Sequence, residues 1–104
     1  MSERGPMTDE LPVEREHAPE RGRYVIRLPG GEEAEMTYHR IGDGRISIDH
    51  TYAPPAFRGQ KLAIRLLERA IADARAEGLT IRPDCSYVAA QFKRHAEWAD
   101  LLAQ

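Results

Sequence analysis

The chain has 104 residues, of which 41% are apolar and 31% charged, and its formal net charge is −2. This length predicts one domain. No run of apolar residues approaches the ~18 that a membrane span needs. The net negative charge argues against a nucleic acid as partner. The N-terminus has no apolar secretion signal and the single cysteine, Cys85, has no partner for a disulfide within the chain, so a cytoplasmic protein is expected.

The first 21 residues differ in composition from the rest of the chain. They mix Ser, Glu, Arg, Pro and Gly with few large apolar side chains, a composition that cannot offset the entropy lost on ordering. We therefore expect residues 1–21 to form a mostly flexible tail and residues 22–104 to form the domain. A short strand at residues 11–16 is the alternative, although Pro12 and the density of charge disfavour it.

Apolar and polar residues alternate in three segments that short glycine-containing turns separate. Such alternation predicts half-buried strands, and short turns between them predict an antiparallel meander. Pro54 and Pro55 end the third strand, because proline lacks the N–H that a ladder needs. The positions on one side of these strands are Tyr24, Ile26 and Leu28, then Ala34, Met36 and Tyr38, then Ile46, Ile48, His50 and Tyr52.

The clearest helix signal lies between residues 63 and 74. Apolar side chains recur there at helical spacing, with charged ones on the opposite face, and Gly78 ends the helix as a C-terminal cap. A short strand at residues 79–81 and a second helix capped by Ser86 follow, and Trp98 is expected in the core. The expected fold class is therefore α+β, a mixed sheet covered by helices.

Residues 50–63 lead from the third strand into the first helix. A junction of this kind presents unpaired backbone N–H groups and the positive end of the helix dipole, and phosphates bind at such places. Arg58 adds a positive charge, and Gly59 lets a ligand approach the backbone closely. An ordinary loop with a solvated arginine explains the same local features, so the residues alone leave both interpretations open.

This junction resembles the acyl-CoA pyrophosphate loop of the GNAT superfamily of acetyltransferases, whose usual form is Arg or Gln, two residues, Gly, one residue, then Gly or Ala. The residues that carry the resemblance are Arg58, Gly59, Gln60, Lys61, Leu62 and Ala63. Further along, the chain resembles the minimal GNAT domains, which lack the usual N-terminal helices, at His50, Thr51, Pro54, Pro55, Pro83, Cys85, Tyr87, Val88, Arg94, His95 and Trp98. The resemblance covers residues 23–102.

The resemblance implies that the chain binds acetyl-CoA and transfers the acetyl group to an unidentified amine. It also implies that backbone donors of residues 60–63 hold the pyrophosphate, and that the strand edge at Thr51 and Tyr52 pairs with the pantetheine arm. Lys93 and Arg94 are candidates for the 3′-phosphate of CoA, with a solvated helix face as the simpler alternative.

Lys61 is a departure from the family pattern, which has its central glycine at this place. Either this position does not require a positive φ in this chain, or the loop is slightly remodelled. A lysine beside a pyrophosphate could also add an attraction of its own.

Cys85 is expected at the start of the second helix, where the helix N-terminus favours the thiolate and the neighbouring Asp84 opposes it. A buried, inert cysteine is the commonest fate of a lone thiol. The resemblance instead places this cysteine beside the thioester of acetyl-CoA. There it either accepts the acetyl group or lines the site.

His50 shares a strand face with Ile46 and Ile48, so alternation predicts that it points inward. It is either a core histidine or the base that takes a proton from the attacking amine. The resemblance implies that Tyr87 protonates the departing CoA thiolate, with a packed aromatic side chain as the alternative. The remaining histidines show no metal-ligand spacing with the cysteine, so no metal site is expected.

Three functions are consistent with these features. The first is acetyl transfer to an amine, either directly from a ternary complex or through an acetylated Cys85. The second is a non-catalytic module that binds CoA or acyl-CoA or another protein, which the absence of acceptor-pocket elements in so short a domain keeps open. The third is an interaction domain that binds no nucleotide. The expected partners are acetyl-CoA and an amine or protein acceptor, for a chain that is a monomer or weak dimer.

Overall fold

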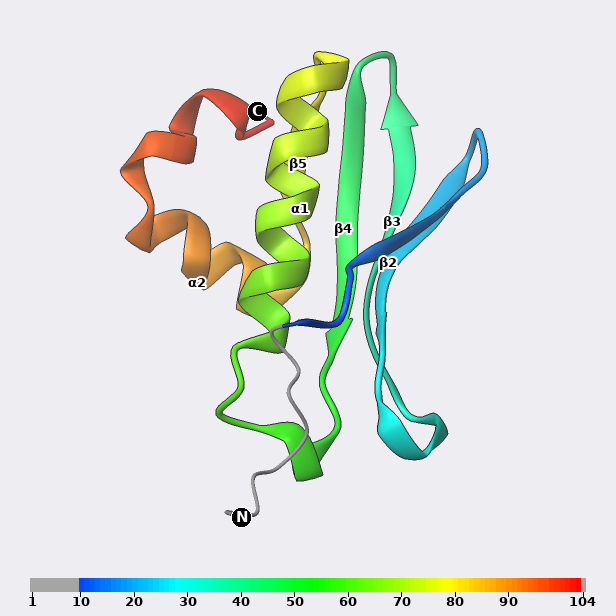
Figure 1. Cartoon of the computed structure of the whole chain (residues 1–104). Helices are drawn as coiled ribbons and strands as arrows, with labels where there is room; N and C mark the ends of the chain where they lie inside the picture. The colour runs from blue at the N-terminus through cyan, green and yellow to red at the C-terminus, as the bar shows by residue number, and fades with distance from the viewer. Residues whose placement is uncertain (1–9, 104) are drawn as a thin grey trace.

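The computed structural model describes residues 10–103, which form a five-stranded sheet and two α-helices (Figure 1). The fold class is α+β, as the sequence predicts. The strands are β1 Glu14–His17, β2 Arg21–Arg27, β3 Glu33–Gly42, β4 Arg45–Tyr52 and β5 Thr80–Pro83. The helices are α1 Leu62–Glu77 and α2 Ser86–Arg94, and the short 3-10 turns are η2 Pro29–Gly31, η3 Pro55–Phe57 and η4 Ala96–Leu101.

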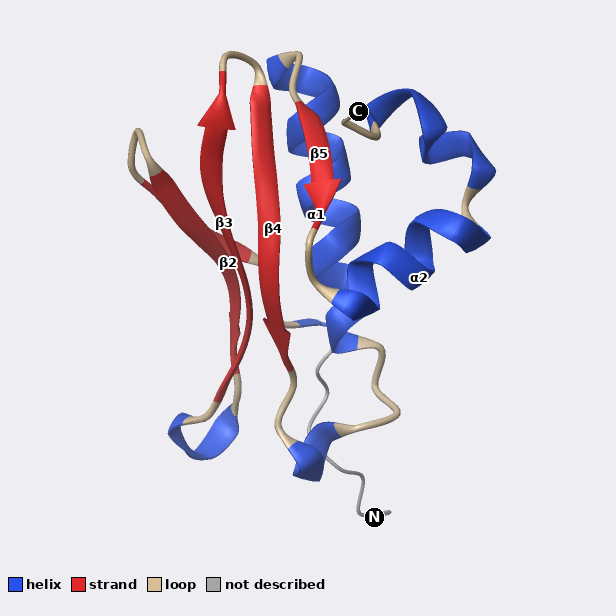
Figure 2. Cartoon of the chain, turned by 180° about the vertical axis from the view of Figure 1, so that it is seen from behind, coloured by secondary structure: helices blue, strands red, loops and turns tan. Residues whose placement is uncertain are grey.

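The strands lie side by side in the order in which the chain forms them. Strands β1 to β4 are antiparallel neighbours, so the predicted meander is confirmed. Strand β5 then pairs parallel to β4, with α1 as the connection between them. Figure 2 shows that β5 ends while β4 continues, so the two strands share only part of their length.

Strand β1 lies within the segment 1–21, for which the sequence predicts mostly a flexible tail with a short strand as the alternative. It pairs with residues 22–25 of β2, and its Arg15 reaches across to α1, where it contacts Asp73 at 3.3 Å and Glu77. The structure therefore has a strand in this segment, because partners distant in sequence stabilise a stretch that has little apolar surface of its own.

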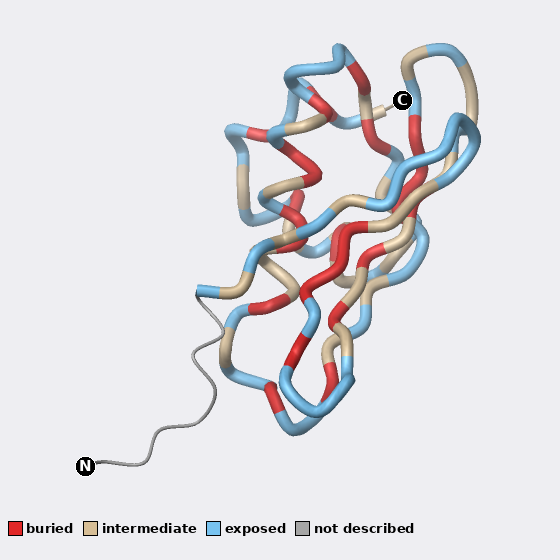
Figure 3. Tube along the Cα trace, turned by 45° about the vertical axis from the view of Figure 1, so that its right-hand side comes forward, coloured by how far each residue is buried: buried red, intermediate tan, exposed pale blue. Residues whose placement is uncertain are grey.

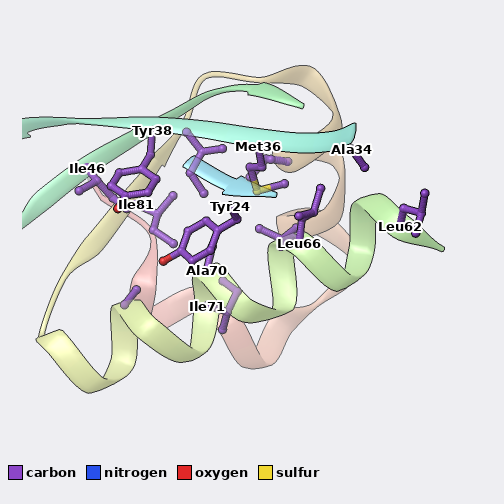
Figure 4. Packing of buried hydrophobic residues seen from close by; sticks show 14 of the residues in the cluster. Tyr24, Ala34, Met36, Tyr38, Ile46, Leu62, Leu66, Ala70, Ile71 and Ile81 are labelled. Carbon is purple, nitrogen blue, oxygen red and sulfur yellow. The ribbon is translucent and has the colours of Figure 1, made fainter. Parts of the chain in front are cut away.

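Helix α1 begins and ends close to the predicted positions. Its C-terminus is capped by Gly78, whose φ of 70° is left-handed and whose N–H donates to the carbonyl of Ala74, as expected for a C-terminal glycine. Its apolar stripe packs on β2 and β3. Figure 4 shows this core, in which the buried members from α1 include Leu62, Leu66, Leu67, Ala70, Ile71 and Ala74.

The C-terminal segment completes the core beside β5. Trp98 is buried, as predicted, and its ring meets Phe92 of α2 edge-on at 5.7 Å and stacks on His95 at 4.0 Å. The backbone then returns to β5, where the N–H of Ala103 donates to the carbonyl of Ile81. These contacts hold α2 and η4 against the edge of the sheet.

The sheet has a polar surface on the side away from this core. Arg23 and Arg27 bind four carboxylates there, those of Glu14, Glu16, Glu33 and Glu35. Figure 3 shows buried residues in the interior of the sheet and helices and exposed ones at the turns. No helix within residues 10–103 is long and apolar enough to cross a membrane.

Candidate active site

Strands β4 and β5 separate where the chain leaves the sheet towards α2. Their pairing ends at Ile48 and Pro83, and the carbonyl of Ile48 then accepts hydrogen bonds from the N–H groups of Asp84 at 3.1 Å and Cys85 at 3.0 Å. Beyond Ile48, the last residues of β4 pair with β3 alone within residues 10–103. One edge of β4 is therefore open opposite the start of α2.

Cys85 occupies the N-cap position of α2, at this separation. Its side chain makes no capping hydrogen bond, is half-buried, and lies with its sulfur 3.3 Å from the Thr51 hydroxyl oxygen. Ser86, predicted as the cap, is instead the first helical residue, because the extended backbone required at the cap is that of Cys85. The thiol thus stands at the N-terminus of α2.

Asp84, the residue before Cys85, has a carboxylate that accepts hydrogen bonds from two side chains. Its carboxylate accepts hydrogen bonds from the hydroxyl of Ser47, which is fully buried, and from Arg82 at 2.7 Å. These two donors, Ser47 first, hold the pKa of Asp84 below its ordinary value. The guanidinium of Arg82 therefore forms an ion pair with the negative charge that the sequence places beside the thiol.

The N-terminus of α1 is the second component of the site. It has no side-chain cap and no acidic residue in its first turn. The N–H of Arg65 donates to the carbonyl of Lys61 at 3.3 Å, so the N–H groups of residues 62–64 precede the first helical hydrogen bond and have no partner inside the helix. The helix dipole is therefore uncompensated at a point where an anion can bind.

The loop before α1 has two residues in the left-handed region. Lys61 has a φ of 61° and Gly59 a φ of 85°. The first alternative for Lys61, that its position does not require a positive φ, is therefore wrong, since the lysine adopts the conformation that glycine adopts easily. A Cβ added at Gly59 would meet no atom within 4 Å, so the backbone there is open to a ligand.

A hollow of about 320 Å³ lies in front of this helix N-terminus. Arg58, Gly59 and Lys61 are exposed at it, whereas the side chain of Leu62 is buried in the core, so Leu62 offers only its backbone. Gln60 is half-buried and does not line the hollow. The lining residues are Ala53, Phe57, Arg58, Gly59, Lys61, Leu62, Ala63, Ile64 and Tyr87.

Tyr87 connects the two components of the site. It follows Cys85 by two residues on α2 and lines the hollow at the start of α1. Burial, and to a lesser extent the negative charge of Glu68, raises the pKa of Tyr87 above its ordinary value. The hydroxyl therefore stays protonated to higher pH and is available as a proton donor.

His50 does not point inward, and this prediction from alternation is wrong. Ile48 pairs with Tyr38 and His50 with the adjacent Thr37, so Asp49 is an extra residue in β4, a β-bulge. A shift of one residue moves the following side chains to the other face. The side chain of His50 is accordingly 56% exposed, with Nε2 3.8 Å from a carboxylate oxygen of Glu35.

The same bulge decides how the end of β4 faces the site. Thr51 turns towards Cys85 and contacts its sulfur, while Tyr52, which alternation places on the inner face, is 46% exposed. A one-residue insertion in a strand leaves no mark in a pattern of alternating residues. The pairing of Thr51 with the thiol could therefore not be read from the sequence.

Two residues that are predicted to bind CoA lie apart from the hollow at the start of α1. Lys93 and Arg94 are exposed in the last turn of α2, and neither lines the hollow. The positive charge of Arg94 lowers the pKa of Tyr87, against the larger effects of burial and Glu68. Within residues 10–103, no group of three His, Cys, Asp or Glu side chains is arranged to hold a metal ion.

Comparisons with known proteins support this fold and indicate a protein family. The sequence profile of the family described as GCN5-related N-acetyl-transferase matches residues 23–101. Protein NATD1 of Danio rerio is 31% identical over 74 residues, which are 70% of this chain and 67% of that protein. Protein NATD1 of Homo sapiens is 28% identical over 85 residues, 81% of this chain and 75% of that protein.

Solved structures of similar shape come from two bacteria. A GCN5-like protein of Staphylococcus aureus, proposed to be an N-acetyltransferase, superposes with a TM-score of 0.65 at 22% identity and covers 88% of both chains. A protein of Klebsiella pneumoniae, proposed to be an acyl-CoA N-acyltransferase, gives a TM-score of 0.56 at 25% identity over 71% of this chain and 55% of that one. The first of these likenesses shows the fold alone.

Proposed function

Because the chain belongs to the GCN5-related N-acetyltransferase family, we propose that it binds acetyl-CoA and transfers the acetyl group to an amine. One observation carries this proposal: the Cys85 thiol stands at the N-terminus of α2 beside the open edge of β4. Tyr87, two residues further, lines the hollow at the start of α1. The Cys85 thiol, the Tyr87 hydroxyl and the N-terminus of α1 therefore belong to one region of the fold, which supports the proposal.

The pyrophosphate of the substrate would bind at the start of α1. The N–H groups of residues 62–64, which have no partner inside the helix, and the helix dipole favour an anion there. The exposed Arg58 and Lys61 add two positive charges. No acidic residue lies in the first turn of α1 to oppose these charges. The hollow thus fits the phosphates of CoA in charge as well as in position.

The pantetheine arm would lie along β4 beyond Ile48, where the strand has no partner on the side of β5. Amide groups of the arm can pair there with the backbone at Thr51 and Tyr52, as an added strand does. This path leads from the hollow towards Cys85. An arm bound along it would place the thioester of acetyl-CoA beside the thiol.

Acetyl transfer would then proceed in two steps through Cys85. Its thiolate attacks the thioester carbonyl, so that a bond from Cys85 sulfur to the acetyl carbon forms while the carbon–sulfur bond to CoA breaks. The CoA thiolate takes the proton of Tyr87, which solvent restores. An amine then attacks the acetyl group and releases the Cys85 thiolate, and the proton of the amine passes to solvent, because His50 faces away from the thiol.

Mass spectrometry of the intact protein tests this proposal. Incubation with acetyl-CoA alone should add the mass of one acetyl group, and Cys85→Ser should abolish the addition. A wild-type chain that acetylates an amine without ever gaining mass would exclude the acetyl-cysteine step and leave direct transfer. For direct transfer, His50→Ala should slow product formation without weakening acetyl-CoA binding. A chain that binds acetyl-CoA with neither adduct nor product would be a non-catalytic module.

A further inference from the structure

Asp84 and Cys85, consecutive residues at the start of α2, place their side chains on opposite faces of β4. Ser47 lies in β4 between Ile46 and Ile48, which belong to the core, so its own side chain is on the face of the strand away from the core. The hydroxyl of Ser47 donates to the carboxylate of Asp84. Asp84 therefore binds β4 from the side away from the core.

The thiol of Cys85 contacts the same strand from the core side. Its sulfur is 3.3 Å from the hydroxyl oxygen of Thr51, and Thr51 is paired with Met36, which is fully buried. Paired residues of an antiparallel sheet share a face. At the edge between the two faces, the N–H groups of Asp84 and Cys85 both donate to the carbonyl of Ile48. The start of α2 is therefore held on β4 at three points, one on each face and one at the edge.

The contact of Asp84 with Ser47 is buried, whereas its contact with Arg82 is exposed. Ser47 is 0% exposed, and a buried hydroxyl that loses its partner destabilises a structure more than an exposed one does. Arg82 binds the same carboxylate at 2.7 Å, but the side chains of Arg82 and Asp84 are 52% and 38% exposed, and exposed ion pairs contribute little. Ser47, ahead of Arg82, lowers the pKa of Asp84, so the ionised carboxylate only accepts hydrogen bonds at neutral pH. Ser47 is thus the main partner of Asp84.

We propose that Asp84 is a positioning residue: by binding Ser47 on one face of β4, it holds the Cys85 thiol on the other. The sheet does not supply this hold, because β5 ends at Pro83, which has no N–H to pair with β4. This role rests on the proposed function, in which Cys85 attacks the thioester of acetyl-CoA. A thiol held in one place reacts faster than a thiol that samples several, because its orientation is fixed before the reaction.

Amide hydrogen exchange of the full chain, measured without acetyl-CoA, tests this hold. Asp84→Ala leaves the Ser47 hydroxyl without its acceptor, and exchange of the Cys85 N–H should become about tenfold faster, as the loss of a charge-assisted hydrogen bond predicts. Asp84→Asn keeps an oxygen that accepts the hydroxyl and should recover most of the protection. Asp100→Ala is the matched control, because Asp100 also binds an arginine, Arg75 at 2.8 Å, but lies in η4. Exchange at Cys85 should be unchanged in this control.

The rate of adduct formation connects this hold to the proposed reaction. At saturating acetyl-CoA, Asp84→Ala should gain the acetyl mass about tenfold more slowly than the wild type, and Asp84→Asn should lie between them. The affinity for acetyl-CoA should not change, because Asp84 does not line the hollow at the start of α1. A loss of rate without a loss of affinity is expected of a positioning residue and not of a residue that binds the ligand.

Equal exchange of the Cys85 N–H in Asp84→Ala and the wild type would overturn the inference, and so would faster exchange with an unchanged rate of adduct formation. Exchange that becomes faster by the same factor throughout β2 and β3 would overturn it as well, because Asp84 would then stabilise only the fold as a whole. A wild-type chain that forms no adduct would refute the acetyl-cysteine step of the proposed function, while the exchange measurements would still decide whether Asp84 holds the start of α2.

Discussion

The thiol of Cys85 donates a hydrogen bond to the hydroxyl oxygen of Thr51, with 3.3 Å between sulfur and oxygen. This contact joins the N-cap residue of α2 to the end of β4, across the place where β4 and β5 separate. When the thiol ionises, the same hydroxyl can rotate and donate to the sulfur. Thr51 is thus a positioning residue for the proposed nucleophile.

Thr51→Val should slow the formation of the acetyl adduct by about tenfold. Valine keeps the shape of the side chain but removes a hydrogen bond to a charged group, which contributes about 1.5–3 kcal/mol. The measurement is the rate at which the intact mass rises after mixing with acetyl-CoA. Thr51→Ser is the control and should restore the rate, whereas a normal rate in Thr51→Val would show that the hydroxyl has no role.

Tyr87→Phe should lower the rate of acetyl transfer while leaving acetyl-CoA affinity unchanged. Because burial and Glu68 raise the pKa of Tyr87, the hydroxyl stays protonated as the pH rises, and the rate should fall only above the ordinary tyrosine value of about 10. Glu68→Gln should move this fall to lower pH. Tyr52→Phe, outside the hollow, is the control, and an unchanged pH profile in Tyr87→Phe would remove the tyrosine from the mechanism.

Lys61→Gly should stabilise the fold by about 1 kcal/mol. The left-handed backbone costs an L-residue about 1–2 kcal/mol, and the greater conformational entropy of the unfolded chain with glycine offsets part of this gain. Urea unfolding measures the change. Gly59→Ala, at a φ of 85°, should have the opposite effect.

Lys61→Asn separates the charge from the backbone, since asparagine tolerates the left-handed region. If the ammonium attracts phosphate, both Lys61 variants bind acetyl-CoA less tightly and with a weaker salt dependence. Tighter binding by Lys61→Gly would show that the lysine only replaces a glycine.

Ser47→Ala should raise the pKa of Asp84 towards its ordinary value, because the Ser47 hydroxyl is the largest cause of the depression and Arg82 remains. A carboxylate whose pKa is lowered by folding stabilises the fold at pH values above its pKa in the unfolded chain, which is about 3.9. This stabilisation is lost as the pH falls through the pKa in the folded protein. The stability deficit of Ser47→Ala should therefore be present at pH 7 and shrink as the pH falls below the unfolded value of about 3.9. Carbon NMR of the Asp84 carboxyl measures the shift, and an unchanged titration would contradict it.

Arg15→Met should destabilise the fold by about 2 kcal/mol, because it removes charge-assisted hydrogen bonds that fasten β1 to α1. The pKa of Glu77, which Arg15 lowers, should rise in the variant. Urea unfolding and carboxyl titration measure the two effects. The exposed Arg45 provides the control Arg45→Met, and equal stability of the two variants would show that β1 contributes little.

The sequence by itself determined the elements whose signals are local. The stripe of apolar residues between 63 and 74 defines α1, and Gly78 ends it, because helix periodicity and a left-handed cap depend on neighbouring residues alone. Alternation in the same way defines most of β2, β3 and β4. The loop at Arg58 and Gly59 likewise predicts a helix N-terminus open to a ligand, and α1 begins there without a side-chain cap from Lys61.

Only the tertiary structure decided which side chains meet. The bulge at Asp49 turns His50 outward and Thr51 towards Cys85, because strand register depends on pairing with β3 and not on the alternation within β4. Likewise β1 forms from a polar segment because Arg15 finds Asp73 and Glu77 on a helix about sixty residues later. Contacts over such separations depend on how the elements pack together, which no local pattern contains.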